Sequence, residues 1–373
     1  MKFNRYALSD LATIKYGKNQ KKVLSDSGNI PIYGTGGLMG YATTALYDKP
    51  SVLIGRKGTI GKVKYVEHPF WTVDTLFYTI VNTDIVLPKY LYYVMSLIDL
   101  NNYNEGTTIP SLRTETLNRL EFDIPSLEEQ ETILSCLNPI DEKIALNNAI
   151  NNNLEQQAMA LFKSWFIDFE PFDRQVPKTW INGILGDFVE IKRGGSPRPI
   201  QNFLSDSGFH WLKISDATGI SSPFINEIKE YIIEAGLKKT VYLKSGSLVL
   251  SNSATPGLPK ILDIDTCIHD GWLYFPSSKF SNEYLYLYFK HIRDNLIALG
   301  NGSVFTNLKT DILKNYPTYL PTEDVLKKFD GLVQPIFSMI LSKTREIKRL
   351  AEIRDTLLPK LMSGELDVSK IDI

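Results

Sequence analysis

The chain has 373 residues, of which 43% are hydrophobic and 22% are charged, a composition typical of a soluble globular protein with two or three domains. Its only cysteines, Cys136 and Cys267, belong to no CxxC or Cys/His cluster, which argues against a disulfide framework or a structural metal site and favours a reducing cytoplasm. The sequence has no apolar run long enough for a membrane helix and no apolar core of a signal peptide at its start, so no membrane association is expected.

The net charge of −1 conceals an uneven distribution along the chain. Residues 1–125 carry 14 lysines and arginines against 11 acidic residues, and residues 171–321 carry 16 against 14. Residues 126–170 carry 2 against 8, whereas residues 322–373 carry 9 of each. Two mildly basic blocks therefore alternate with an acidic one and a neutral one, which is compatible with a nucleic-acid partner without requiring it.

Segments near the start of the chain recur later in it. The run 8-LSDLATIKYG-17 returns as 185-LGDFVEIKRG-194, and residues 106–125 align with residues 302–321 at a shift of 196. Such self-similarity indicates one unit present twice. Each copy is expected to begin with a body of short strands and one helix, with strands at 51–54, 75–81, 241–243 and 247–250 and helices at 88–98 and 282–292.

Each body is followed by a long helical tail with an apolar heptad seam at the same phase in both copies. The tails are expected to begin after Pro125 and Pro321 and to be kinked or restarted at Pro139 and Pro335, and the second is expected to end at Gly364. Ser126 and Glu129 form a plausible capping box. The predicted seam consists of Ile133, Leu137, Ile140, Ile144, Leu154, Leu161, Phe329, Val333, Ile336, Ile340, Ile347, Leu350 and Leu357.

A seam this narrow favours a partner helix, and the other tail is the obvious candidate. The alternative is that each tail packs on its own body, which is the commoner fate of an amphipathic helix. We predict an α+β (mixed α/β) fold with two bodies in a pseudo-twofold arrangement, joined by two long antiparallel coiled-coil helices. The expected domains are residues 1–125 and 171–321 for the bodies and residues 126–170 and 322–373 for the helical spacers.

The stretch 55-GRKGTIGK-62 invites comparison with a phosphate-binding loop. Five residues separate Gly55 from Gly61 instead of four, and Val63 stands where a P-loop needs a hydroxyl. The following residues suggest a strand and a turn, not a helix whose N-terminus could face a phosphate. The four histidines are scattered and GxSxG is absent, so we predict no catalysis and no metal site in this chain.

Three motifs carry a resemblance to a known family. They are 180-WINGILGDFVEIKRGGSP-197, the block 106-GTTIPSLR-113 and 124-IPSLEEQ-130. Together with the repeat and the paired tails, they make the chain similar to the specificity (S) subunit of type I DNA restriction-modification systems. The resemblance covers essentially the whole chain, although 320-LPTEDVLKKF-329 departs from the motif present in the first copy.

This resemblance implies separate roles for the bodies, the coiled coil and the partner subunits. Each body would be a target recognition domain for one half of a bipartite site in double-stranded DNA, and the coiled coil would fix the distance between the half-sites. Two methyltransferase (modification) subunits would dock on the chain, and restriction (endonuclease and translocase) subunits would join them. S-adenosylmethionine, ATP and Mg would be bound by those partners, with no cofactor in this chain, in a prokaryotic cytoplasm.

Candidate DNA contacts are polar and basic residues in the loops of both copies. Arginine and lysine suit phosphate or guanine contacts, and asparagine, serine and threonine suit other base edges. The candidates in the first copy are Thr35, Arg56, Lys57, Thr59, Lys62, Thr107, Thr108 and Arg113. Those in the second copy are Arg193, Ser196, Arg198, Asn252, Ser253, Thr255, Ser303, Thr306, Asn307 and Lys309.

Two other interpretations remain open from the sequence. The loops could be tight turns with solvated lysines, in a scaffold whose bodies bind proteins and whose coiled coil is a spacer. A nucleotide-using enzyme would instead bind ATP or S-adenosylmethionine as an isolated chain. Binding of duplex DNA that weakens steeply with salt would distinguish a DNA-recognition protein from both.

Overall fold

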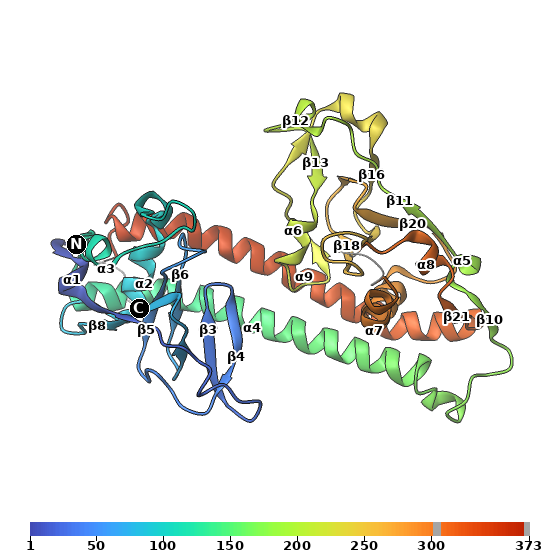
Figure 1. Cartoon of the computed structure of the whole chain (residues 1–373), viewed down its shortest axis with the longest axis horizontal. Helices are drawn as coiled ribbons and strands as arrows, with labels where there is room; N and C mark the ends of the chain where they lie inside the picture. The colour runs from blue at the N-terminus through green and yellow to red at the C-terminus, as the bar shows by residue number, and fades with distance from the viewer. Residues whose placement is uncertain (301–306, 369–373) are drawn as a thin grey trace. The chain divides into compact units, whose positions relative to one another are not determined.

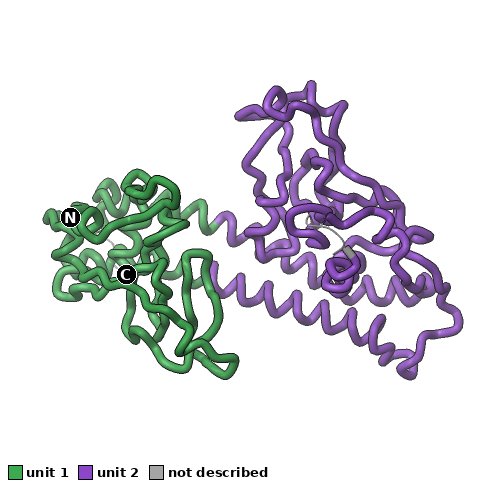
Figure 2. The backbone as a smooth tube through the Cα atoms, viewed as in Figure 1, with its two compact units in different colours: residues 1–142, 350–373 green, residues 143–349 purple. Residues whose placement is uncertain are grey.

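The structure, a computed structural model, describes residues 1–300 and 307–368 (Figure 1). The chain divides into unit 1, with residues 1–142 and 350–373, and unit 2, with residues 143–349 (Figure 2). Two helices of 40 residues, α4 (Leu127–Phe166) and α9 (Glu323–Met362), contribute residues to both units. Strands and helices are mixed in each unit, which confirms the predicted fold class.

Unit 1 is built on three small sheets. The largest is antiparallel, with the order β2 (Ala12–Tyr16), β8 (Leu76–Val81), β5 (Ser51–Gly55) and β6 (Val63–Val66). A second sheet has the order β4 (Gly37–Ala42), β3 (Ile30–Gly34) and β7 (Trp71–Thr72), and β1 (Asn4–Ala7) pairs with β9 (Glu121–Ile124). The helices are α1 (Leu8–Leu11), α2 (Pro88–Ser96) and α3 (Thr114–Asn118), with a 3₁₀ turn at Leu100–Tyr103. The apolar run at 51–54 is buried because β5 is a central strand against which α2 packs.

Unit 2 follows the same plan with more strands. One sheet has the order β11 (Val189–Arg193), β20 (Trp272–Ser278), β17 (Leu248–Ser251), β18 (Pro259–Leu262) and β14 (Phe224–Ile225). Another has the order β12 (Leu204–Ser205), β15 (Tyr231–Ile232), β13 (Phe209–Leu212), β19 (Thr266–Ile268) and β16 (Val241–Leu243), and β10 (Ile181–Ile184) pairs with β21 (Pro317–Leu320). Its helices are α5 (Leu185–Phe188), α6 (Ile214–Thr218), α7 (Asn282–Gly300) and α8 (Thr310–Lys314), with 3₁₀ turns at Glu170–Phe172, Ile200–Asn202 and Glu234–Lys239.

The sequence repeat corresponds to a structural repeat. In unit 1 a short helix and strand, α1 and β2, lead to a glycine at position 17, and in unit 2 α5 and β11 lead to Gly194. A Cβ on Gly17 would lie 2.0 Å from the carbonyl oxygen of Val73, and one on Gly194 would lie 2.2 Å from that of His269. Both glycines are therefore required where the two chain segments approach each other.

The ends of the long helices follow the predicted signals. The Ser126 hydroxyl accepts a hydrogen bond from the amide of Glu129 at 3.3 Å, and the Glu129 carboxylate accepts one from the amide of Ser126 at 3.0 Å, which confirms the capping box. Helix α9 ends at Met362, and Gly364 follows with a φ of +77°, as expected for a glycine that terminates a helix. The expected restart at Pro139 and Pro335 is wrong, because α4 and α9 continue through these residues.

The two long helices pair with each other in an antiparallel sense. Within unit 2, the Asn151 amide donates to the Thr344 hydroxyl at 3.3 Å, and the rings of Phe166 and Phe329 lie 4.7 Å apart. Partner numbers on α9 fall as those on α4 rise, as antiparallel pairing requires. Within unit 1, Arg354 donates to the Asp141 carboxylate at 3.2 Å. The predicted pairing of the tails is therefore confirmed.

The predicted seam is only part of the buried surface of these helices. Its buried members are Ile133, Leu137, Phe329, Val333 and Ile340, and its half-buried members are Ile140, Ile144, Leu154, Leu161, Ile336, Ile347, Leu350 and Leu357. Phe162 and Phe337, next to seam positions, are almost fully buried in a core that includes Tyr284 and Leu285 of α7. The helices thus pack on the bodies as well as on each other, so the alternative prediction holds alongside the pairing.

Candidate nucleic-acid interface

Three loops of unit 1 that carry predicted DNA contacts lie against one another. The loop at 55–62 connects β5 to β6, and the segment at 106–113 runs beside it. The amide of Gly58 donates to the carbonyl of Pro110 at 2.9 Å, and that of Leu112 donates to the carbonyl of Arg56 at 2.9 Å. These bonds bring the candidates of both segments together, namely Arg56, Lys57, Thr59 and Lys62 with Thr107, Thr108 and Arg113.

The turn at 33–37 joins the same surface. A hollow of about 340 Å³ is lined by Thr35 from this turn and by Thr59 and Lys62 from the loop that follows β5. The ammonium group of Lys64 stands 3.8 Å from the centre of the Tyr33 ring in this hollow, and burial lowers the pKa of Lys64. Thr59 and Lys62 are exposed and Thr35 is half-buried, so this side of unit 1 presents hydroxyl and ammonium groups beside an aromatic ring.

Arg56 is held in a defined position, unlike its exposed neighbour Lys57. Its Nη1 donates to the backbone carbonyl of Asp74 at 2.8 Å, and its Cζ lies 5.0 Å from the centre of the Tyr16 ring. One face and one edge of the guanidinium are thereby fixed. A guanidinium oriented in advance loses less conformational entropy when it binds a base or a phosphate.

Arg113 already has an acidic partner. Its Nε lies 3.1 Å from the Glu105 carboxylate, and its side chain is 70% exposed. Glu105 also accepts a hydrogen bond from the Thr116 hydroxyl. Because an exposed ion pair of this kind contributes little to stability, Arg113 can exchange Glu105 for a phosphate at small cost.

Two glycines of the loop at 55–62 lie close to other parts of the protein. A Cβ on Gly55 would lie 2.2 Å from the carbonyl oxygen of Thr59, and one on Gly61 would lie 2.2 Å from the Asn101 amide. Only Gly58, with a φ of +89°, stands in open space apart from a distant contact with the Thr35 hydroxyl. The compact turn therefore requires Gly55, whose Cβ would meet backbone atoms, whereas Gly61 faces only the end of the Asn101 side chain.

Unit 2 repeats the backbone frame that holds Arg56. The amide of Arg56 donates to Thr75 at 2.8 Å, and that of Asn252 donates to Gly271 at 2.8 Å. The amide of Leu308 donates to the carbonyl of Asn252 at 2.7 Å, just as Leu112 donates to that of Arg56. Positions 56 and 252 are therefore structurally equivalent and carry an arginine in one unit and an asparagine in the other.

Four candidates of unit 2 gather around Asp270. The Ser196 hydroxyl donates to its Oδ1 at 2.7 Å and Arg198 to its Oδ2 at 3.0 Å, while Arg193 and the Asn252 amide donate to its backbone carbonyl. The hydrogen bond from Ser196, followed by the charges of Arg193 and Arg198, lowers the pKa of Asp270. The sequence analysis missed this carboxylate, although Asp74 stands at the same place in the repeat, 196 residues earlier.

The guanidinium at this place comes from a different position in each unit. In unit 1 Arg56 donates to the Asp74 carbonyl and stacks on Tyr16, and in unit 2 Arg193 donates to the Asp270 carbonyl. Arg193 corresponds to Tyr16 in the aligned runs 8–17 and 185–194. Both units thus place a guanidinium on the equivalent carbonyl. In unit 1 it comes from position 56, and in unit 2 it comes from position 193, which is the equivalent of position 16. The polar surface next to the carbonyl therefore differs between the units.

The remaining candidates of unit 2 are less uniform. Asn252 is only 4% exposed, and its Oδ1 has no hydrogen bond within the described residues. Ser253 and Thr255 are half-buried in the turn after β17, whereas Asn307 and Lys309 are exposed and Lys309 stands directly before α8. Ser303 and Thr306 lie outside the described residues.

Across residues 1–300 and 307–368, no group of three or more His, Cys, Asp or Glu side chains could hold a metal ion. In the same part of the chain, no helix is both long and apolar enough to cross a membrane.

Known proteins resemble this chain in sequence. The family model described as type I restriction modification DNA specificity domain matches the chain twice, at residues 2–156 and 177–347. The specificity subunit of the type I restriction enzyme MjaIX of Methanocaldococcus jannaschii is 29% identical over 350 residues, which cover 87% of this chain and 80% of that protein. The HindI specificity subunit of Haemophilus influenzae is 26% identical over 387 residues, covering 82% and 84% of the two chains.

A solved structure shares the fold. The crystal structure of the type I restriction-modification system S subunit from M. genitalium superposes with a TM-score of 0.60 at 16% identity, covering 97% of this chain and 96% of that chain. Two family matches cover most of the sequence, and both units present the same loop frame at their candidate surfaces. The chain therefore belongs to the type I restriction modification DNA specificity family, as a DNA-specificity subunit without a catalytic role of its own.

Proposed function

We propose that each unit recognises one half of a bipartite site in duplex DNA, and that the pairing of α4 with α9 fixes the distance between the halves. Two modification subunits dock on the chain and methylate the site, and restriction subunits join them. These partners bind S-adenosylmethionine, ATP and Mg, and the complex works in the cytoplasm of a prokaryotic cell. The domain limits at 1–125, 126–170, 171–321 and 322–373 separate the recognition bodies from the helical spacers in this proposal.

The observation that carries the proposal is the shared frame around positions 56 and 252. The same backbone hydrogen bonds hold arginine in unit 1 and asparagine in unit 2. Arginine pairs best with the O6 and N7 of guanine, and asparagine with the N6 and N7 of adenine. A common frame with different side chains is what two different half-sites require of one duplicated fold.

The surroundings assign secondary roles. The exposed Lys57 and Lys62 suit phosphate contacts, which position a protein on the duplex without specifying its sequence. Arg56 uses Nη1 on the Asp74 carbonyl, which leaves its other donors for a base or a phosphate. Asn252 is only 4% exposed and its amide donates to the Asp270 carbonyl, so its side chain must leave this bond and turn outward to pair with a base.

The long helices offer surfaces for the modification subunits. Leu332 and Met339 of α9, seven residues apart and thus on one face, are 45% and 50% exposed in unit 2. Residues 126–170 are acidic, which disfavours contact with phosphate and leaves this segment for protein partners. Apolar residues at heptad spacing on a helix are suited to a helix of a partner.

Titration of the chain with its modification subunits against duplex DNA at several salt concentrations tests the proposal. We expect the affinity to fall by about 10³-fold or more between 50 and 200 mM salt if six or more phosphates are contacted. A duplex that carries the methylated site should bind more tightly than a scrambled one. Affinity without dependence on salt or sequence would favour the protein-binding scaffold instead.

A further inference from the structure

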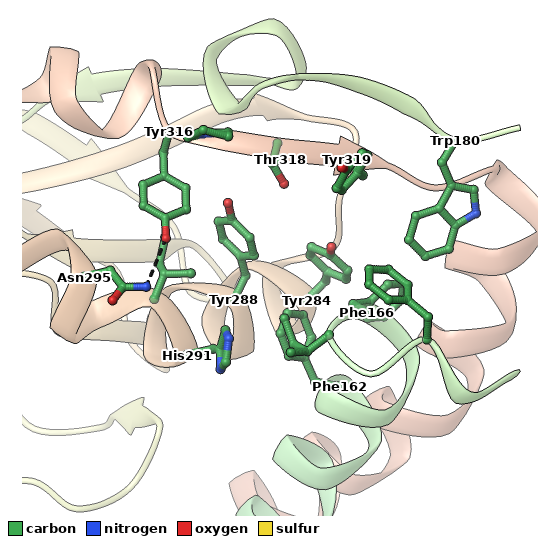
Figure 3. Close-up of a pocket in the computed structure, with 14 residues that line it drawn as sticks. Phe162, Phe166, Trp180, Tyr284, Tyr288, His291, Asn295, Tyr316, Thr318 and Tyr319 are labelled. Carbon is green, nitrogen blue, oxygen red and sulfur yellow. Dashed lines mark hydrogen bonds between the residues drawn. The ribbon is translucent and has the colours of Figure 1, made fainter. Parts of the chain in front are cut away.

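A pocket of about 260 Å³ lies in unit 2 among aromatic side chains (Figure 3). Phe162 and Phe166 of α4 form one wall, and Tyr284 and Tyr288 of α7 form another. Thr318 of β21 closes the pocket from the side of the sheet. None of the described residues that line it is Asp, Glu, Lys or Arg, and burial lowers the pKa of His291, so a charged ligand would find little compensating charge there.

The repeat explains why this space is empty in unit 2. Thr318 corresponds to Phe122 of unit 1 at the shift of 196, and each is the buried second residue of its strand, in β21 and β9. Phe122 is 4% exposed and packs in one core with Leu358 and Met362, which correspond to Phe162 and Phe166. Unit 1 therefore places a phenyl ring of its own where unit 2 has a threonine and a pocket.

A polar group of the pocket lacks a partner. Tyr288 is only 7% exposed, and its hydroxyl oxygen makes no hydrogen bond within the described residues. Figure 3 shows this hydroxyl pointing between Tyr316 and Thr318. Burial raises the pKa of Tyr288 and interaction with the Thr318 hydroxyl lowers it, but the two groups do not meet the geometry of a hydrogen bond. A buried hydroxyl left unpaired is destabilising, and a bound polar atom that pairs with it would remove this cost.

We infer that this pocket receives the side chain of a tyrosine from the modification subunit when the complex assembles. In unit 1 a phenyl ring fills the equivalent space, which indicates that an aromatic ring fits the pocket. The unpaired Tyr288 hydroxyl indicates that this ring carries a polar atom. The size is sufficient, because an apolar cavity of about 150 Å³ already holds benzene. A tyrosine side chain brings both features without a charge, and the inference rests on the proposed docking of modification subunits.

Filling the pocket from within tests the inference. In Thr318→Phe the new ring should enter the pocket as Phe122 does in unit 1, so the melting temperature should rise and the affinity for the modification subunit should fall at least tenfold. Thr318→Val is the matched control, because it keeps the size of threonine and leaves the pocket open, and its affinity should stay within twofold of wild type. Wild-type affinity in Thr318→Phe would overturn the inference.

A probe applies the same test to the unaltered chain and remains available if Thr318→Phe does not fold. We expect 4-methylphenol, the side-chain analogue of tyrosine, to give saturable magnetisation transfer in NMR with the full chain and to lose it in the complex with modification subunits. Absence of binding to the full chain, or equal binding to the chain and the complex, would contradict the inference.

The two proposals fail in different ways. If the wild-type chain does not assemble with the modification subunits at all, the proposed function is wrong. If it assembles and binds DNA with the expected salt dependence, while Thr318→Phe assembles equally well, only the pocket assignment is wrong.

Discussion

Arg56 and Asn252 show how one backbone frame can present two chemistries. Each residue exchanges main-chain hydrogen bonds with equivalent neighbours, and each side chain donates to the carbonyl of an aspartate at the same place in the repeat. The side chain can therefore change while the frame persists. At the scale of single residues, specificity in this fold depends on which donors and acceptors remain after these internal bonds are made.

Replacing Arg56 by alanine should weaken binding to the specific duplex by about 1–3 kcal/mol, because a guanidinium held by Asp74 and Tyr16 is lost. Fluorescence anisotropy with the assembled complex measures the change. Arg5→Ala is the matched control, since it removes an exposed guanidinium that is paired with Asp123 in the sheet of β1 and β9. An equal loss of affinity in both variants would show that Arg56 contributes only its positive charge.

Lys260 makes the stability of unit 2 depend on pH. It is 3% exposed and donates to the carbonyls of Ile220 and Ser222, and burial lowers its pKa to about 8. Between pH 8 and its ordinary value near 10.5, the unfolded chain binds the proton that the folded chain has released, so the free energy of unfolding rises with pH.

Denaturation by urea of wild type and Lys260→Met should reveal this dependence. Between pH 8 and 10.5, the free energy of unfolding of wild type should rise relative to that of Lys260→Met by up to about 3 kcal/mol. A difference that stays constant over this range would show that Lys260 remains protonated in the folded protein.

The long helices illustrate at the scale of elements why a heptad pattern predicts only part of a packing surface. The pattern places Ile336 in the seam, whereas the structure buries its neighbour Phe337 more deeply. Phe337 contacts Phe224 and Tyr286 of the body, at ring distances of 6.2 and 5.5 Å. Because α9 packs on the body as well as on the partner helix, its most buried position lies one residue beyond the predicted seam. The heptad periodicity alone carries no information about the contact with the body.

Alanine substitutions at the two neighbouring positions should separate these contributions. Phe337→Ala should lower the free energy of unfolding by about 3–5 kcal/mol, because it leaves a cavity in the core. Ile336→Ala should lower it by no more than about 2 kcal/mol, because this side chain is only half-buried. Urea denaturation measures both. A larger loss in Ile336→Ala would mean that the contact between the helices dominates over the contact with the body.

At the scale of the whole molecule, the duplication was the feature that the sequence predicted best. Repeated motifs, the capping box at Ser126 and the helix end at Gly364 are local signals, and the structure has all three. Other features depend on residues that meet only after folding. Asp270 gathers Ser196 and Arg198 from more than 70 residues away. The pocket beside Thr318 becomes visible only when its neighbours are compared with those of Phe122.

Both units share a frame, and this leads to the central claim that they recognise separate halves of one site. Mapping of methylated positions in the genome of a host that expresses the complete system tests it most directly, with wild type and Arg56→Ala side by side. We predict two specified blocks of bases separated by unspecified ones, and relaxed sequence requirements in only one block for Arg56→Ala. A single continuous motif, or relaxation of both blocks together, would contradict this account.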